Sequence, residues 1–180
     1  MGDVVVLKVG GRQFDAWTSV SVSKGIRDVA GAFSLEYAER TSEAAEPRQI
    51  KRGDSCQVLV GGDVVITGWV DVAAPSFDAR SRSLSVEGRD KACDLVDCSA
   101  MNTPGVWKNR TLSQIANDLI SPFGLAVEVR ADVGAAFKRF ALQQGETVWE
   151  AVERLARFRG LLAISTATGG VAFITPGQRR

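Results

Sequence analysis

The sequence predicts a mainly β fold with an α+β part: a small N-terminal β-barrel, then a small domain ordered helix, strand, strand, helix, strand, strand. In the first half, apolar and polar residues alternate along several stretches, as in strands with one buried face. Three Gly-Gly pairs follow predicted strands, two of them in the first half and one, at 169–170, in the second, and adjacent glycines favour tight hairpin turns because both can adopt positive φ. In the second half, apolar residues recur at helical spacing in two segments.

The stretch 17–40, WTSVSVSKGIRDVAGAFSLEYAER, predicts two neighbouring strands that organise the barrel. In its second arm Phe33, Leu35 and Tyr37 share one face. The insert 26–30, between Gly25 and Gly31, is long enough for one helical turn. A flat sandwich could use a two-residue turn here, so the insert favours a barrel with a capped mouth.

Further strands are expected on either side of this pair. Gly68 lies inside one of them and predicts a bulge or a sharp bend there. A polar segment at 41–47 is expected to form an exposed loop. The strands are predicted at 4–9, 12–14, 56–60, 64–72 and 83–88, with Gly-Gly turns at 10–11 and 61–62.

The second half begins after a linker. Asp90 is expected to cap a short helix at 91–96 that belongs to the barrel. In the α+β domain, Thr111 with Gln114 and Thr147 with Glu150 form two capping boxes. We place the barrel at 1–98, the linker at 99–106, the α+β domain at 107–176 and a polar tail at 177–180. The α+β helices begin at these boxes, and its strands are expected at 125–129, 137–142, 161–165 and 171–174.

Length and charge limit the classes of protein to which the chain can belong. The chain has 180 residues, enough to bury its own core, and 22 Lys and Arg against 21 Asp and Glu. A net charge of +1 gives no global field toward nucleic acid or anionic membrane. The charge is uneven, because residues 106–180 carry +4 and residues 1–105 carry −3. No apolar run of 18 residues and no signal peptide is recognisable, so we expect cytoplasmic synthesis without membrane insertion.

The sequence offers little for catalysis. It contains no histidine, which removes the commonest general base and zinc ligand. Ser21 and Lys24 match Ser-x-x-Lys, but they lie along an alternating strand instead of at a helix start. Asp90, Asp94 and Asp97 are explained by a helix start and a solvated face. We therefore expect no catalytic residues, and without a phosphate-binding glycine loop we expect no cofactor.

Cysteines and tryptophans are interpreted as packing residues. Cys56, Cys93 and Cys98 lack Cys-x-x-Cys spacing, so we expect three reduced, mostly buried thiols and no metal. For the tryptophans, packing is favoured over stacking on sugars or bases. They lie at positions 17, 69, 107 and 149.

Several stretches together resemble the baseplate hub protein of Mu-like contractile phage tails. The resemblance covers nearly the whole chain and extends to the hub portion of type VI secretion spikes. The matching stretches are SKGI (23–26), AGAFSL (30–35), IKRGD (50–54), ITGWVD (66–71), LSVEGRD (84–90), TLSQIA (111–116), QGETVWEA (144–151) and RLA (154–156).

This resemblance implies a structural protein. In its full-length form such a hub is a homotrimer in which each subunit gives two similar hub-type or tube-type barrels. The trimer joins the hexameric tail tube to the trimeric spike, in the tail baseplate of a virion assembled in the bacterial cytoplasm. The resemblance implies that the chain has no catalytic site and that no sequence-specific nucleic acid is among its partners. It does not identify the residues of the interface between subunits. A second barrel is expected after Pro176, so we interpret the chain as a fragment.

Two other interpretations remain open at this point. The stretch 145–152, GETVWEAV, resembles the start of the LysM family, whose members bind peptidoglycan. Trp149 would then lie at the glycan site, although LysM continues to a second helix and Gly160 here precedes a predicted hairpin. The other interpretation is a free-standing enzyme that uses Asp90 or Ser21.

Overall fold

The chain forms two compact units, Met1–Asp90 and Lys91–Arg180, in a computed structural model. The structure describes residues 4–26, 29–40, 50–77, 81–101 and 103–177. The short helix predicted after Asp90 is present, but it lies in the second unit, whereas the sequence analysis grouped it with the barrel.

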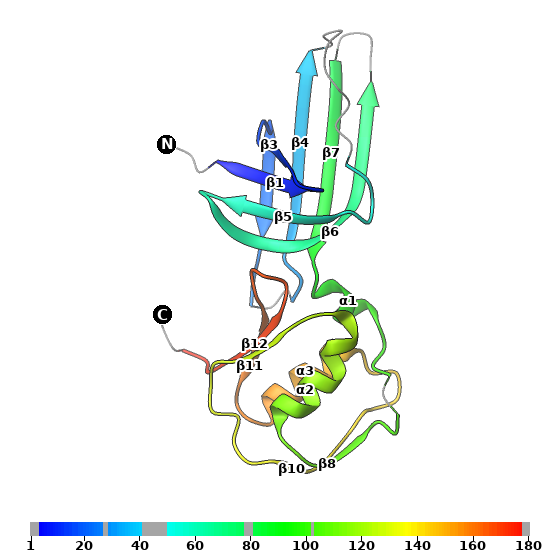
Figure 1. Cartoon of the computed structure of the whole chain (residues 1–180), viewed down its shortest axis with the longest axis vertical. Coiled ribbons are helices and arrows are strands. Elements are labelled where there is room, and N and C mark those ends of the chain that lie inside the picture. The colour runs from blue at the N-terminus through cyan, green and yellow to red at the C-terminus, as the bar shows by residue number, and fades with distance from the viewer. Residues whose placement is uncertain (1–3, 27–28, 41–49, 78–80, 102, 178–180) are drawn as a thin grey trace. The chain divides into compact units, whose positions relative to one another are not determined.

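The first unit is a single antiparallel sheet of seven strands. Their order across the sheet is β2-β1-β5-β6-β7-β4-β3, so strands far apart in sequence lie side by side (Figure 1). The strands are β1 (Val5–Val9), β2 (Arg12–Phe14), β3 (Ser19–Ser23), β4 (Ala32–Arg40), β5 (Ser55–Val60), β6 (Asp63–Phe77) and β7 (Ser81–Asp90).

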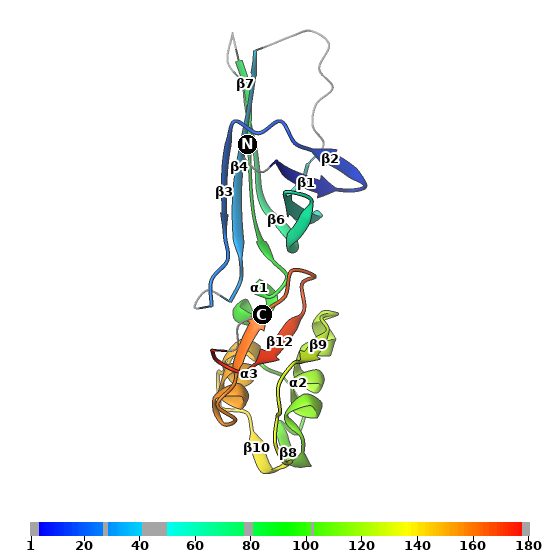
Figure 2. The same cartoon turned by 90° about the vertical axis from the view of Figure 1, so that its left-hand side faces the viewer.

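Strand β6 gives the sheet its curl. Its first half pairs with β5 and its second half with β7, with a register shift between Val70 and Val72. Such a bulge bends a strand and increases its twist. Figure 1 shows β1 and β5 crossing in front of the layer that contains β4 and β7, and Figure 2 shows β1 and β2 to one side of that layer. The predicted barrel is thus a curled half-barrel, with β2 and β3 as edge strands that do not pair with each other in the described sheet.

The core lies between these two layers. The predicted inward face of β4 is confirmed, because Phe33 and Leu35 are buried and Tyr37 packs against them. In β3, Val22 packs against the core, whereas Val20 is 43% exposed. The buried residues of the first unit are Leu7, Val9, Phe33, Leu35, Ile50, Cys56, Val58, Ile66, Val70, Leu84 and Val86.

Two of the predicted Gly-Gly hairpins connect β1 to β2 and β5 to β6. Gly10 and Gly11 have φ of 56° and 79°, which glycine adopts without a Cβ clash. A bulge or a sharp bend is predicted at Gly68, and the register shift of β6 lies two residues further on, between Val70 and Val72. A Cβ atom on Gly68 would lie 1.8 Å from the backbone oxygen of Arg89, so this glycine permits close approach of β6 and β7.

The capped mouth is only partly within the described residues. Of the expected helical turn at 26–30, residues 27 and 28 lie outside them, as does the loop expected at 41–47. Ile26 is 70% exposed, so its side chain does not fill the end of the half-barrel.

The second unit follows the predicted order with two additions before it, the helix α1 and the strand β8. Helices α2 and α3 pack against each other, β8 pairs with β10, and a second sheet has the order β11-β12-β9. The elements are α1 (Cys93–Asp97), β8 (Val106–Arg110), α2 (Leu112–Ile120), η1 (Ser121–Phe123), β9 (Val127–Val129), β10 (Phe137–Ala141), α3 (Val148–Arg157), β11 (Leu162–Ser165) and β12 (Val171–Ile174).

Both predicted capping boxes are present. The Thr111 hydroxyl accepts a hydrogen bond from the Gln114 N–H, and the Gln114 side chain accepts one from the Thr111 N–H. Thr147 and Glu150 make the same pair of bonds at the start of α3. Within the described residues, no helix has the length and apolar character needed to cross a membrane.

Candidate functional site

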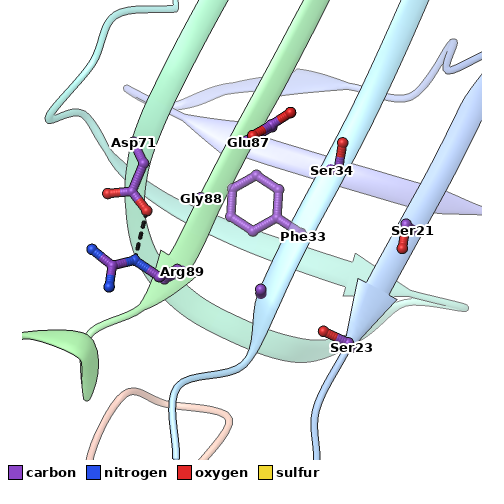
Figure 3. A pocket seen from close by; sticks show the side chains of 9 residues that line it. Ser21, Ser23, Phe33, Ser34, Asp71, Glu87, Gly88 and Arg89 are labelled. Carbon is purple, nitrogen blue, oxygen red and sulfur yellow. Dashed lines mark hydrogen bonds and ion pairs between the residues drawn. The ribbon is translucent and has the colours of Figure 1, made fainter. Parts of the chain in front are cut away.

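A shallow depression of about 360 Å³ lies on the first unit, over strands β3, β4, β6 and β7 (Figure 3). The strand register explains its shape. Ser21, Ser34 and Glu87 are register partners across three strands, so their side chains share a face. Small side chains along these rows leave the surface recessed. The lining residues are Ser21, Ser23, Ala32, Phe33, Ser34, Asp71, Glu87, Gly88 and Arg89.

Gly88 permits the packing beneath this depression. It is the register partner of Phe33, whose buried ring lies beside it in Figure 3. A Cβ atom on Gly88 would lie 2.2 Å from the backbone oxygen of Trp69 and 2.5 Å from Cζ of Phe33. Any larger residue would therefore displace a strand or the ring.

The depression carries a net negative charge. Arg89 Nε donates a hydrogen bond to Asp71 Oδ2 over 2.9 Å, and both side chains are partly exposed. Glu87 is exposed and has no ion-pair partner within the described residues. Serine hydroxyls and one uncompensated carboxylate suit a cationic or hydrogen-bonding partner.

Ser21 and Lys24, which match Ser-x-x-Lys in the sequence, do not form a pair of nucleophile and general base in the structure. Lys24 Nζ lies 3.8 Å from Asp90 Oδ2 and donates a hydrogen bond to the Val65 carbonyl. Burial lowers the pKa of Lys24, and the charge of Asp90 opposes that effect. The lysine therefore engages a carboxylate, not a serine hydroxyl.

The expected helix-capping role of Asp90 is wrong. Helix α1 begins after Ala92, and no side chain caps it. Asp90 is the last residue of β7 and is fully buried, where its carboxylate accepts a hydrogen bond from the Gly31 N–H at 3.0 Å. Tertiary packing places this carboxylate against Lys24 and Gly31, so it is not available to the helix.

The cysteines do not come together. Cys56 and Cys93 are buried and Cys98 is exposed, and all three are free thiols. Burial raises the pKa of Cys56 to about 12. Over the part of the chain that the structure describes, His, Cys, Asp and Glu form no cluster of three that could hold a metal ion.

Packing is confirmed for Trp107, which is buried beside Phe140, and for Trp17, which packs against the core of the first unit. The Trp107 indole N–H donates to Asp118 at 2.9 Å, and that of Trp17 donates to the Phe14 carbonyl at 3.0 Å. Trp149 is only 8% exposed within α3, so it offers no open face for stacking on a sugar. The hairpin of β11 and β12 follows that helix, where LysM has a second helix.

Sequence reasoning missed a second surface, in the pair β8–β10. We call Lys108, Arg110, Lys138 and Arg139 the basic ribbon. All four side chains are exposed, and none has an ion-pair partner within the described residues. Lys108 and Arg139 are direct register partners. The excess positive charge after residue 106 was the available signal, but β8 itself was not predicted.

Two family models together match almost the whole chain. Residues 4–90 match the model described as Mu phage baseplate assembly protein GpP-like, N-terminal. Residues 92–175 match the model described as baseplate hub protein gp44-like, second domain. The stretch 145–152 lies within the second match, and nothing supports the LysM interpretation.

Individual relatives agree with these matches. The chain is 40% identical over 176 residues to baseplate hub protein gp44 of Escherichia phage Mu, covering 96% of this chain and 46% of that protein. It is 38% identical to the crystal structure of the 43 kDa tail protein of prophage MuSo2 from Shewanella oneidensis, with a TM-score of 0.90 over 100% of this chain and 57% of that chain. The chain is 29% identical to the tail protein from Neisseria meningitidis MC58. The TM-score of that comparison is 0.81, over 96% of this chain and 50% of that chain.

The chain thus spans about half the length of these relatives. A more distant likeness, of fold alone, is to the c3393 protein of E. coli, a component of the type VI secretion system. That protein is 9% identical with a TM-score of 0.55, over 99% of this chain and 48% of that chain. Because each compact unit is matched over nearly its full length and in the same order, the chain belongs to the baseplate hub family of Mu-like phage tails.

Proposed function

We propose that this chain is a structural part of a phage or prophage tail baseplate hub, and that it works in the virion. The observation that carries the proposal is the consecutive match of its two units to the N-terminal and second-domain families of baseplate hub proteins. The relatives are named as baseplate hub or tail proteins, and none of their names describes a reaction.

We infer that the role is non-enzymatic. The carboxylate that the enzyme interpretation uses, that of Asp90, is engaged by Lys24, and the Asp71 carboxylate in the depression is engaged by Arg89. The serines of the depression lie on β3 and β4 without a base in hydrogen-bond contact among the described residues. This arrangement supports binding by shape and charge over turnover.

The partners we propose are copies of the same subunit, arranged as a trimer, together with the tail tube and the spike. Strands β2 and β3 end the sheet with backbone groups that a neighbouring chain can pair with. Repetition of one such contact around an axis gives a closed ring. The remainder of the relatives' length lies outside this chain, so the complete contact set belongs to the longer proteins.

Disruption of the gene tests this function. In the phage or prophage that encodes the chain, we expect disruption to yield particles with no complete baseplate under the electron microscope, and to abolish infection. Expression of the full-length gene in trans should restore both. Infectious particles with intact baseplates after disruption would contradict the proposal.

A further inference from the structure

We propose that the basic ribbon of one copy docks on the acidic depression of the first unit of a second copy. This inference rests on the proposed function, because it assumes that the chain acts by associating with copies of itself. It adds to that function a specific pair of surfaces, one on each unit.

The acidic surface is centred on Glu36 and Glu87. Glu36 is the register partner of Ser85, and Glu87 that of Ser34, so the two glutamates are diagonal neighbours on one face of β4 and β7. Their Cα atoms are therefore separated by about 7–8 Å. Both are exposed, and neither has an ion-pair partner within the described residues. Two carboxylates so close together bind a cation better than either alone.

The depression beside Glu87 can receive a long side chain. Serine side chains from β3 and β4 line it, and their hydroxyls can accept hydrogen bonds from an ammonium or guanidinium group. In Figure 3 the carboxylate of Glu87, the hydroxyl of Ser34 and the Asp71–Arg89 pair lie around the same recess. The surface thus combines negative charge with space for Lys or Arg.

The basic ribbon has matching properties. Lys108 and Arg139 lie directly opposite each other on paired strands, which places their Cβ atoms about 4.5–5.5 Å apart. Like charges in that position are destabilising, and no described carboxylate pairs with them. A partner that brings two carboxylates to this position would remove the repulsion. Glu36 and Glu87 are such a pair.

The charge of the whole chain favours a second copy over nucleic acid. Residues 1–90 carry a net charge of −2 and residues 91–180 carry +3, so the same polypeptide supplies both signs. Beneath the ribbon, the rings of Trp107 and Phe140 are buried and cannot stack on bases, and Phe158, beside Phe137, is the exposed ring of this cluster. With a total charge of +1, the chain also lacks a strong general attraction for phosphates.

Charge-swap variants test this pairing. Sedimentation velocity over a concentration series is measured for the wild-type chain, for K108E/R139E, for E36K/E87K, and for an equimolar mixture of the two variants. The control K51E/R52E makes the same charge change as K108E/R139E, but at exposed positions of the first unit. Runs at about 0.05 M and about 0.5 M salt separate exposed ionic contacts from others, because screening is stronger at high salt.

The proposal predicts salt-sensitive self-association of the wild type that each double variant weakens by about tenfold or more, as loss of complementary charge does at interfaces. The mixture should associate again, and K51E/R52E should behave as the wild type. Circular dichroism and thermal unfolding must show that every variant is folded.

Three outcomes would overturn the pairing. These are a wild type that stays monomeric at low salt, variants that associate as the wild type does, and a mixture that does not recover association. A fluorescein-labelled single-stranded oligonucleotide is titrated in parallel. Loss of its binding in K108E/R139E without recovery in the mixture would identify a nucleic-acid surface instead. None of these results alters the gene-disruption phenotype, so the hub function is judged separately.

Discussion

Buried charged residues hold several of the contacts on which this fold depends. Asp90 is fully buried between the Gly31 N–H and Lys24, and Glu146 is only 8% exposed beside Arg154. Neither environment could be predicted from sequence, because in each case the burial comes from segments that the chain brings together only on folding. The requirement for glycine at position 88 is similar, because it arises from the position of the Phe33 ring.

Replacing Glu146 with Gln should destabilise the second unit by about 2 kcal/mol at neutral pH, the range for hydrogen bonds to charged groups. Arg154 donates two hydrogen bonds of 2.7 Å to the Glu146 carboxylate. Burial alone would raise the pKa of Glu146, but the hydrogen bonds and charge of Arg154, with the Gln143 N–H, lower it below its usual value.

The loss of stability caused by this substitution should therefore depend on pH. A lowered folded-state pKa means that the carboxylate stabilises the protein above its unfolded pKa of about 4.3, and that this contribution is lost as pH falls through the folded value. Urea unfolding of wild type and E146Q should differ at pH 7 and converge in acid. E153Q, which alters an exposed pair with Arg157, should change stability by under about 0.5 kcal/mol. A difference that grows in acid would contradict this account.

Thiol reactivity should separate the three cysteines. Only Cys98 is exposed, and burial raises the pKa of Cys56 to about 12, so that this thiol stays protonated at mildly alkaline pH. An Ellman titration of the folded protein should show one rapidly reacting thiol, and all three after denaturation. Rapid reaction should disappear in Cys98→Ser. Fast modification of a second thiol in that variant would show that the core is more open than described.

Gly88→Ala should destabilise the first unit by about 2–3 kcal/mol, in the upper range for overpacking a core. The added methyl group would overlap the Trp69 carbonyl and the Phe33 ring. Ser83→Ala, at an exposed site on the same strand, should stay within about 0.5 kcal/mol of wild type. Urea unfolding followed by circular dichroism measures both, and equal stability of the two variants would refute the packing argument.

Elements defined by local chemistry were predictable from the sequence. The Gly-Gly turns and the two capping boxes depend on residues within a few positions, and all are present. The strand β8 was missed because it pairs with β10 far along the chain and Asn109, with φ of 51°, interrupts its alternation. The double pairing of β6, and hence a half-barrel in place of a closed barrel, depends on long-range register that no local pattern encodes.

The capping box of α3 gives a test at this scale. Thr147→Ala removes the oxygen that accepts from the Glu150 N–H and should cost about 1 kcal/mol, the usual value for an N-cap. Thr147→Ser keeps that oxygen and should cost much less. Chemical unfolding of the two variants provides the comparison. Equal losses would mean that the methyl group of Thr147, and not its hydroxyl, stabilises the helix.

At the scale of the molecule, the chain combines a curled sheet whose two edges are unpaired among the described residues, surfaces of opposite charge on its two units, and relatives from tail baseplates. The basic ribbon was predictable only as an excess of positive charge after residue 106, because its residues meet through pairing of β8 with β10. These features support the proposal that the chain works by fitting against other subunits.

Electron cryomicroscopy of the tail particles that contain this protein tests that claim most directly. We predict several copies arranged around the tail axis between tube and spike, each with a seven-stranded half-barrel whose edges contact neighbouring subunits. Particles in which the protein is missing from the baseplate, or is present as a single copy with both sheet edges in solvent, would contradict it.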